Sequence, residues 1–289
     1  MSDKLFTFRW DVDHRVCVTD GIPRIKELCR DLGVPNTFFV NMGRSTNLRE
    51  WLGKGLAGSK AKLNDMEAVH LVKKTGLARF AIETVLSRPV GLSFPGPLQE
   101  LQAEGHELGL HGGMDHVVWS RRFPELPEEV LAADVSESLG HFVASFGPPA
   151  GFTSPGFRSD ERVMRIVDRI GLRYDGDAIG GAPGRTDASG RPLRHWRIPV
   201  TLCGPRTVPF LEWHGARGTA DETILEEVDR HLEANPLTVL YGHPCYEGVR
   251  AGLLRKVFRR VLDRGFRFVT HAEIADLLDA GAIPAGGAA

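Results

Sequence analysis

The sequence predicts an α/β barrel, in which a closed or nearly closed ring of parallel strands is surrounded by helices. Extended and helical patterns alternate along the chain, as expected for parallel strands joined by right-handed helical crossovers. The number of strand-helix repeats favours a barrel over an open sheet. With 289 residues, the chain is long enough to bury the core of one such domain.

The first strand and the first helix are clearly marked. Residues 5–10 (LFTFRW) are apolar and aromatic, as in a buried strand. In residues 19–33 (TDGIPRIKELCRDLG), apolar side chains recur at helical spacing. Thr19 or Asp20 can cap the start of this helix, and Gly33 suits its end.

The later units continue the alternation. Strands are predicted at residues 36–42, 106–111, 150–154, 172–175, 237–243 and 266–270, and helices at 97–105, 127–147, 160–171, 221–236 and 251–265. Residues from about 53 to 95 interrupt this rhythm, so we expect a helical insertion there. The small residues of 281–289 predict a flexible tail, which leaves 1–280 as a single domain.

Composition narrows the class of function. A formal net charge of -1 provides no basic field for nucleic acid, which we do not expect as a partner. The four cysteines lack CxxC spacing, which argues against a zinc knuckle or a disulfide scaffold. No glycine-rich dinucleotide motif follows a strand. With no leader-like or membrane-spanning segment in the sequence, we expect a cytoplasmic protein.

Ionisable side chains follow several of the predicted strands. In parallel barrels, the chemistry is carried by the carboxyl ends of the strands and the loops that follow them. Five strand ends supply such residues: Asp11 and Asp13, His111 and His116, Arg158, Asp177, and His243. Any one of them alone is more often structural than functional. Their recurrence at the same topological position indicates a site.

His111 and His116 flank a Gly-Gly pair in the stretch GLHGGMDHVVW. Residues five apart on an α-helix lie about 140° apart around its axis, so the two histidines would not share a helix face. A turn at Gly112 and Gly113 could bring His116 back beside His111, because glycine tolerates positive φ. Together with Asp13, the two imidazoles would hold a divalent ion and leave positions open for water and substrate. The alternative is a pair of loop histidines without a ligand role.

Asp11 and Asp13 lie two residues apart in the stretch FRWDVD. Side chains at this spacing leave an extended chain on the same face. One carboxylate can therefore bind a metal ion while its neighbour remains free to act as a base.

These stretches resemble the polysaccharide deacetylase family with the NodB-homology domain. The similar segments run in family order over nearly the whole chain: FRWDVD, HELGLHGGMDHVVW, SPGFRSD, LRYDGDAIGG, RIPVTL and YGHPCYEG. Within the family, the chain is most similar to the 4-deoxy-4-formamido-L-arabinose-phosphoundecaprenol deformylases. It departs from the usual pattern in two ways. Its histidine pair is spaced five apart rather than four, and DVD replaces an adjacent Asp-Asp, a feature that the deformylases share.

The resemblance implies a distorted (β/α) barrel and a metal-dependent amide hydrolase. Asp13, His111 and His116 would hold one divalent metal ion; zinc is expected, and iron, cobalt and manganese suit the same ligands. A bound cation of this kind lowers the pKa of its water and polarises a carbonyl group.

The same resemblance assigns proton-transfer roles. Asp11 would be the general base, with Arg158 as the partner that keeps it ionised and oriented. His243 would be the general acid for the leaving amine, and Asp177 would orient its imidazole.

The implied substrate is a formylated or acetylated amino sugar, carried either on a polyprenyl phosphate lipid or in a soluble conjugate. The insertion at 53–95 alternates apolar and basic residues, which fits a helix packed over the barrel or an amphipathic platform in peripheral contact with a membrane. Two other classes remain open, a non-haem iron oxygenase with the same ligand set and a noncatalytic glycan-binding barrel. The acyl group and the oligomeric state are left open.

Overall fold

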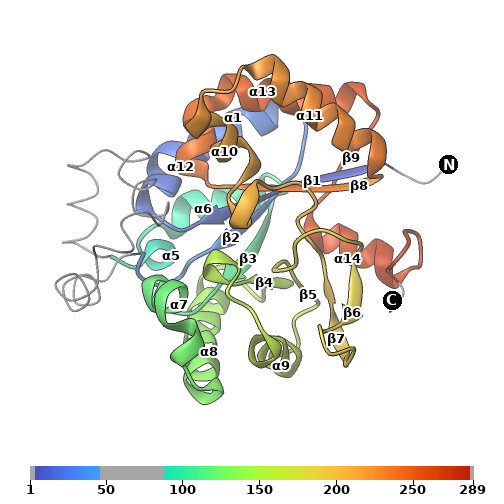
Figure 1. The fold of residues 1–289 in the computed structure, drawn as a ribbon. Coiled ribbons are helices and arrows are strands. Elements are labelled where there is room, and N and C mark those ends of the chain that lie inside the picture. The colour runs from blue at the N-terminus through green and yellow to red at the C-terminus, as the bar shows by residue number, and fades with distance from the viewer. Residues whose placement is uncertain (1–3, 46–87, 287–289) are drawn as a thin grey trace.

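Parallel strands form the centre of the fold in the computed structural model, which describes residues 4–45 and 88–286 (Figure 1). The strands are β1 (Leu5–Val12), β2 (Thr37–Val40), β3 (Glu107–His111), β4 (Gly151–Thr153), β5 (Tyr174–Asp175), β6 (Gly184–Thr186), β7 (Pro192–Arg197), β8 (Leu237–Gly242) and β9 (Arg267–Phe268). Their order in the sheet is β6-β7-β5-β4-β3-β2-β1-β8, and β9 pairs with β1. The β6-β7 pair is antiparallel, and the other pairs are parallel.

The sheet curls into a half-barrel that is nearly closed by the segment after β7. Thr201 N donates a hydrogen bond to Val239 O of β8 at 2.9 Å, and Leu202 forms an isolated parallel bridge with Leu240. These contacts bring the two ends of the strand order together. The predicted distorted (β/α) barrel is therefore confirmed.

Helices surround the curled sheet: most pack around its outer face, whereas the last helix packs against inward-facing residues such as Leu5 and Tyr174. The helices are α1 (Ile22–Leu32), α5 (Val90–Ser93), α6 (Pro95–Ala103), α7 (His116–Arg122), α8 (Glu128–Phe146), α9 (Glu161–Ile170), α10 (Phe210–Arg217), α11 (Asp221–Ala234), α12 (Pro244–Glu247), α13 (Ala251–Asp263) and α14 (His271–Asp279). In Figure 1, α1, α11 and α13 lie above β1 and β8, whereas α8 and α9 lie below the strands β3 to β5.

Strand β1 is buried on both faces, and its alternation explains how it carries the site. Phe6, Phe8, Trp10 and Val12 belong to the main apolar core. The alternate positions face the inside of the barrel. Three of them carry buried polar side chains: Thr7, Arg9 and Asp11. One strand therefore supplies both the apolar packing and the polar interior.

The strands and helices predicted from the alternating pattern are present in the described part of the chain, with one wrong detail. Neither Thr19 nor Asp20 caps a helix through its side chain; a short π-helical turn, Cys17–Gly21, leads directly into α1 instead. Gly33 ends α1 in the left-handed conformation, with a φ of 66°, as predicted. The β6-β7 hairpin and the helices α7, α10 and α14 were not expected.

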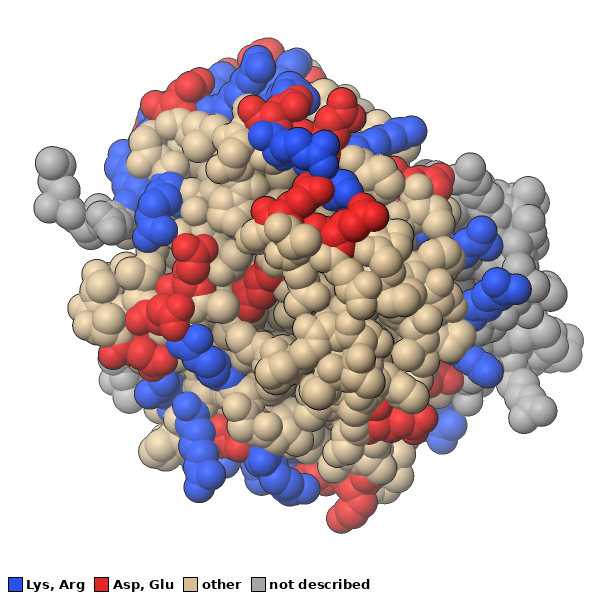
Figure 2. Space-filling model, turned by 180° about the vertical axis from the view of Figure 1, so that it is seen from behind, with Lys and Arg blue, Asp and Glu red and all other residues tan. Residues whose placement is uncertain are grey.

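Most of the proposed insertion at 53–95 lies outside the described residues, and α5 falls in its last part. In the proposed tail, Ile283 is buried and Gly286 N donates a hydrogen bond to Pro183 O, while 287–289 are not described. Among the described residues, no helix has the length and apolar character needed to cross a membrane. On the face shown in Figure 2, basic and acidic side chains are interspersed around the edge and form no continuous field of one sign.

Candidate active site and metal centre

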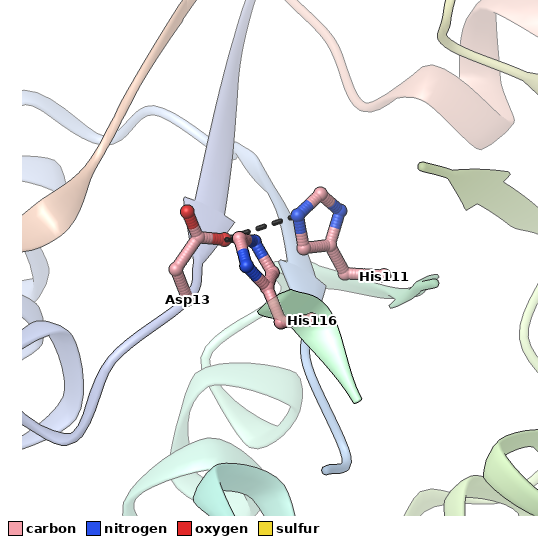
Figure 3. Close-up of side chains that lie close together, drawn as sticks. All are labelled: Asp13, His111 and His116. Carbon is pink, nitrogen blue, oxygen red and sulfur yellow. Dashed lines mark ion pairs between the residues drawn. The ribbon is translucent and has the colours of Figure 1, made fainter. Parts of the chain in front are cut away.

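The structure brings Asp13, His111 and His116 together at the carboxyl ends of β1 and β3 (Figure 3). Asp13 Oδ1 lies 3.0 Å from His111 Nε2 and 3.4 Å from His116 Nε2. One potential ligand atom from each residue lies within 4.8 Å of the others. Within residues 4–45 and 88–286, this is the one group of three or more histidine, cysteine or acidic residues with such spacing.

The donor set of this group fits a divalent metal ion. Asp13 Oδ1 is buried and accepts no hydrogen bond, although two ring nitrogens lie close to it. Burial opposes ionisation of Asp13, but His116 and His111 outweigh it and hold the pKa of the carboxyl well below its usual range. His111 Nδ1 lies 2.7 Å from Thr153 Oγ1, which orients the ring so that Nε2 faces Asp13. Such partners orient metal-binding histidines in known sites.

The glycine turn predicted between the two histidines is present. Gly112 has a φ of 67°, and its N–H donates to Thr153 O at 2.8 Å. A Cβ atom at this position would lie 2.6 Å from Pro155 Cδ, so a side chain would not fit. The turn leads directly into α7, whose first residue is His116. The five-residue spacing is therefore compatible with both imidazoles facing one carboxylate.

His243 joins this group from the end of β8. Its Nε2 atom lies 3.3 Å from Asp13 Oδ2, and its Nδ1 atom lies 2.5 Å from Glu212 Oε1. Glu212 is buried in α10. Because a carboxylate only accepts hydrogen bonds, the proton of His243 is assigned to Nδ1, and Nε2 faces the site.

The expectation that Asp177 orients His243 is wrong, because the carboxylate of Asp177 is engaged elsewhere. Its Oδ1 atom accepts from Ser154 N at 2.8 Å, and Oδ2 accepts from Ser154 Oγ at 2.7 Å. Burial raises the pKa of Asp177 to about 7, against the opposing effect of Arg9. The residue that holds His243 is instead Glu212.

Asp11 is held by a buried arginine of its own strand. Arg9 Nε donates to Asp11 Oδ1 at 2.7 Å, and Nη2 donates to Oδ2 at 2.8 Å. Arg9 Nη1 donates to Gly176 O at 2.5 Å, which occupies the remaining side of the guanidinium. The guanidinium lies between 4.5 and 5.6 Å from the centres of three aromatic rings: Phe157, Phe39 and Tyr241.

The expected pairing of Asp11 with Arg158 is therefore wrong. Phe157 has a φ of 56°, and its ring lies over Arg9. The next side chain, Arg158, is exposed. At this position the chain therefore places an aromatic ring against Arg9, and Arg9 rather than Arg158 is the cation that contacts Asp11.

Three residues that hold the site were not predicted from the sequence: Arg9, Thr153 and Glu212. A signal existed for Arg9, because it lies two residues before Asp11 in the same strand and must share its face. Thr153 lies within the strand predicted at 150–154 and is opposite His111 in the parallel register of β3 and β4. No local pattern identified Glu212, because α10 was not predicted. His214, in the same helix as Glu212, has its Nε2 atom 3.3 Å from Glu227 Oε2.

The fold is the α/β half-barrel of the polysaccharide deacetylase (NodB) type. No family model matches the sequence. A solved structure from Mycobacterium smegmatis, assigned as a polysaccharide deacetylase, is similar, with a TM-score of 0.66 and 15% identity over 100% of this chain and 95% of the other. A Pseudomonas aeruginosa PAO1 protein with the same assignment gives a TM-score of 0.62 and 14% identity over 97% and 92%. The structure of PuuE allantoinase is also similar, with a TM-score of 0.61 and 15% identity over 96% of this chain and 89% of the other.

Proposed function

We propose that this protein is a metal-dependent hydrolase that removes a formyl or acetyl group from the nitrogen of an amino sugar. The observation that carries the proposal is the convergence of two acid–base pairs on one candidate metal centre. Asp11 is held by Arg9 near the carboxyl end of β1, two residues before Asp13, while His243 is held by Glu212 and contacts Asp13. The assignments of two similar solved structures as polysaccharide deacetylases also support it.

Asp13, His111 and His116 would hold the metal ion, and zinc is our first choice, with iron, cobalt or manganese as alternatives. When bound, the ion supplies a nucleophile from water at neutral pH and polarises the acyl carbonyl. Without such help an amide is a poor electrophile and its amine a poor leaving group.

The other residues of the site move protons. Asp11 accepts the proton of the attacking water, and its two hydrogen bonds from Arg9 fix the orientation of its carboxylate. Each carboxylate oxygen retains a second lone pair for the incoming proton. His243 acts in its doubly protonated form: it donates the proton of Nε2 to the leaving nitrogen, and Glu212 stabilises the charged imidazole at Nδ1. Arg158, which is exposed after β4, is proposed to contact substrate rather than the base.

The finer substrate assignment rests on the resemblance of the motifs to the deformylases. It makes a formamido sugar on a polyprenyl phosphate our first choice, and a soluble acylated amino sugar the second. Contact with the inner face of a membrane would come from residues 53–95, whose apolar and basic alternation is the supporting pattern. Such a substrate would be met in the cytoplasm.

The test is to load the purified protein with Zn²⁺ or Co²⁺ and offer N-formyl and N-acetyl amino sugars, each with and without a prenyl phosphate. We expect free amine from at least one substrate, under air and under argon alike. Asp11→Asn should retain the metal and lose hydrolysis by at least about a hundredfold, because the base is removed.

Three outcomes would contradict the proposal. A metal-loaded protein that releases no amine and only retains glycan would favour the noncatalytic barrel. A reaction that requires oxygen would favour the iron oxygenase. An Asp11→Asn variant as active as the wild type would remove the assigned base.

A further inference from the structure

We propose that Asp134 in α8 is a positioning residue for the candidate metal centre, which it serves by fixing the chain on both sides of His116. The inference deepens the proposed function and rests on its metal site. Asp134 is half-buried and lies 18 positions after His116 in the sequence, outside every motif considered above.

The two carboxylate oxygens of Asp134 hold two different parts of the chain. Oδ1 accepts a hydrogen bond from Met114 N at 3.0 Å, and Oδ2 accepts one from Trp119 Nε1 at 2.6 Å. Met114 lies two residues before His116, and Trp119 lies three residues after it. A single carboxylate therefore links the glycine turn to the first turn of α7.

The carboxylate lies directly against the backbone of the turn. A Cβ atom on Gly113 would lie 1.7 Å from Asp134 Oδ2 and 2.8 Å from Trp119 Nε1. Only glycine therefore leaves room for Asp134 to reach Met114 and Trp119 together. This explains the second glycine of the HGGMDH stretch, whose φ is not positive.

The opposite side of the turn is held by the loop after β2. Met114 O accepts a hydrogen bond from Arg44 N at 2.9 Å, and His116 N donates to Arg44 O at 3.1 Å. Gly43 permits this approach, because a Cβ atom there would lie 1.9 Å from Met114 O. The peptide groups before His116 are thus fixed from α8 on one side and from the β2 loop on the other.

The two imidazoles are therefore positioned by different means. His111 belongs to a strand, and its ring contacts Thr153 directly. His116 follows an irregular turn, so its backbone position depends on the groups that hold residues 113–119. Metal sites require ligands placed within about 0.5 Å, and loss of an outer-shell partner typically weakens metal binding by about 10–100-fold.

The experiment is a Co²⁺ titration of the metal-free protein against a competing chelator, with the visible absorption of bound Co²⁺ as a second readout. Asp134→Ala should weaken Co²⁺ binding by about 10–100-fold and alter the Co²⁺ spectrum. Trp119→Phe removes one of the two donors and keeps an aromatic ring, so it should cause a smaller loss. The double variant should lose less than the sum of the two single effects, because both act through one carboxylate.

Two control variants on α8 distinguish a positioning role of Asp134 from a general loss of protein stability. Glu137→Ala, at an exposed site, should bind Co²⁺ as the wild type does. Phe142→Leu, in the core, should lower the unfolding temperature and leave Co²⁺ affinity within about threefold.

The outcomes are distinguishable. If Asp134→Ala and Trp119→Phe both bind Co²⁺ like the wild type, or if Phe142→Leu weakens binding as much as Asp134→Ala does, the positioning role is overturned while the metal site stands. If the wild type itself binds no Co²⁺, the metal site of the proposed function is overturned, and this inference with it.

Discussion

Two buried clusters combine histidine with aspartate, and they differ in which residue type is in excess. At the carboxyl ends of the strands, the single carboxylate of Asp13 lies within 3.4 Å of nitrogen atoms from three histidines: His111, His116 and His243. Between β5, β7 and α9, the single imidazole of His195 lies between two carboxylates, those of Asp168 at 2.6 Å and Asp175 at 3.0 Å.

The second cluster is a complete ion-pair network. Burial favours the neutral ring of His195, but Asp175 and Asp168 outweigh it and raise the pKa of the imidazole. Both ring nitrogens then act as donors, and each has an acceptor. No lone pair remains on this ring for a metal ion.

The first cluster has the opposite balance. His243 has a second carboxylate partner in Glu212, whereas His111 and His116 share the carboxylate of Asp13. Neutral imidazoles present lone pairs that suit a cation. The ratio of carboxylate to imidazole therefore separates a ligand set from a structural ion pair, although both clusters are buried and contain the same residue types.

The largest expected effect is a direct test of this distinction. His116→Ala removes a lone pair from the first cluster and should reduce Co²⁺ affinity by about a thousandfold or more, in line with losing one of three protein ligands. His195→Asn should leave Co²⁺ affinity within about threefold. Chelator competition measures both. Equal losses in the two variants would mean that the clusters are not functionally different.

A second prediction compares the two arginines assigned to the base. Arg9→Met leaves the buried carboxylate of Asp11 without its partner and should lower the free energy of unfolding by about 3–5 kcal/mol. Arg158→Met changes an exposed side chain and should lie within about 0.5 kcal/mol of the wild type. Urea unfolding measures both values. The reverse order would restore Arg158 as the structural partner of Asp11.

The sequence was sufficient for the parts of this molecule that follow from local pattern and topology. Alternation of apolar segments predicted the strands and helices. The rule that strand ends share one rim placed Asp13, His111 and His116 together, because parallel strands must present their carboxyl ends on the same side. The glycine pair predicted the turn, since positive φ at Gly112 is a local requirement.

The partners of the acid and the base were not predicted, because they depend on tertiary structure. Phe157 adopts a left-handed conformation that an aromatic residue rarely takes, and the next side chain, Arg158, is exposed. Glu212 reaches His243 from α10, 31 positions earlier in the chain, after an irregular segment. The spacing of residues in the sequence predicts neither the conformation of Phe157 nor the contact between Glu212 and His243.

A third prediction concerns the acid. Glu212→Gln keeps the shape of the side chain and removes its charge, so the protonated form of His243 loses its carboxylate partner. We expect kcat to fall by about 10–100-fold with little change in KM. Glu227→Gln, which alters the contact of His214, is the matched control and should leave kcat unchanged.

The smallest expected effect returns to the second cluster and its dependence on pH. The pKa of His195 is raised in the folded state, so its contribution to stability is fully present below the ordinary histidine value of about 6.5 and is lost as pH rises through the higher folded value. His195→Asn should therefore destabilise the protein most at or below about pH 6. The difference from the wild type in the free energy of unfolding should be smaller at pH 9 than at pH 6.

Urea unfolding of both proteins at the two pH values measures this change. The histidines of the first cluster are present in both proteins, so their contribution to the free energy of unfolding cancels in the difference. A difference that grows with pH would mean that the ring is neutral when folded. His195 would then offer a lone pair, and the ratio of carboxylate to imidazole would no longer explain why only the first cluster is suited to a metal ion.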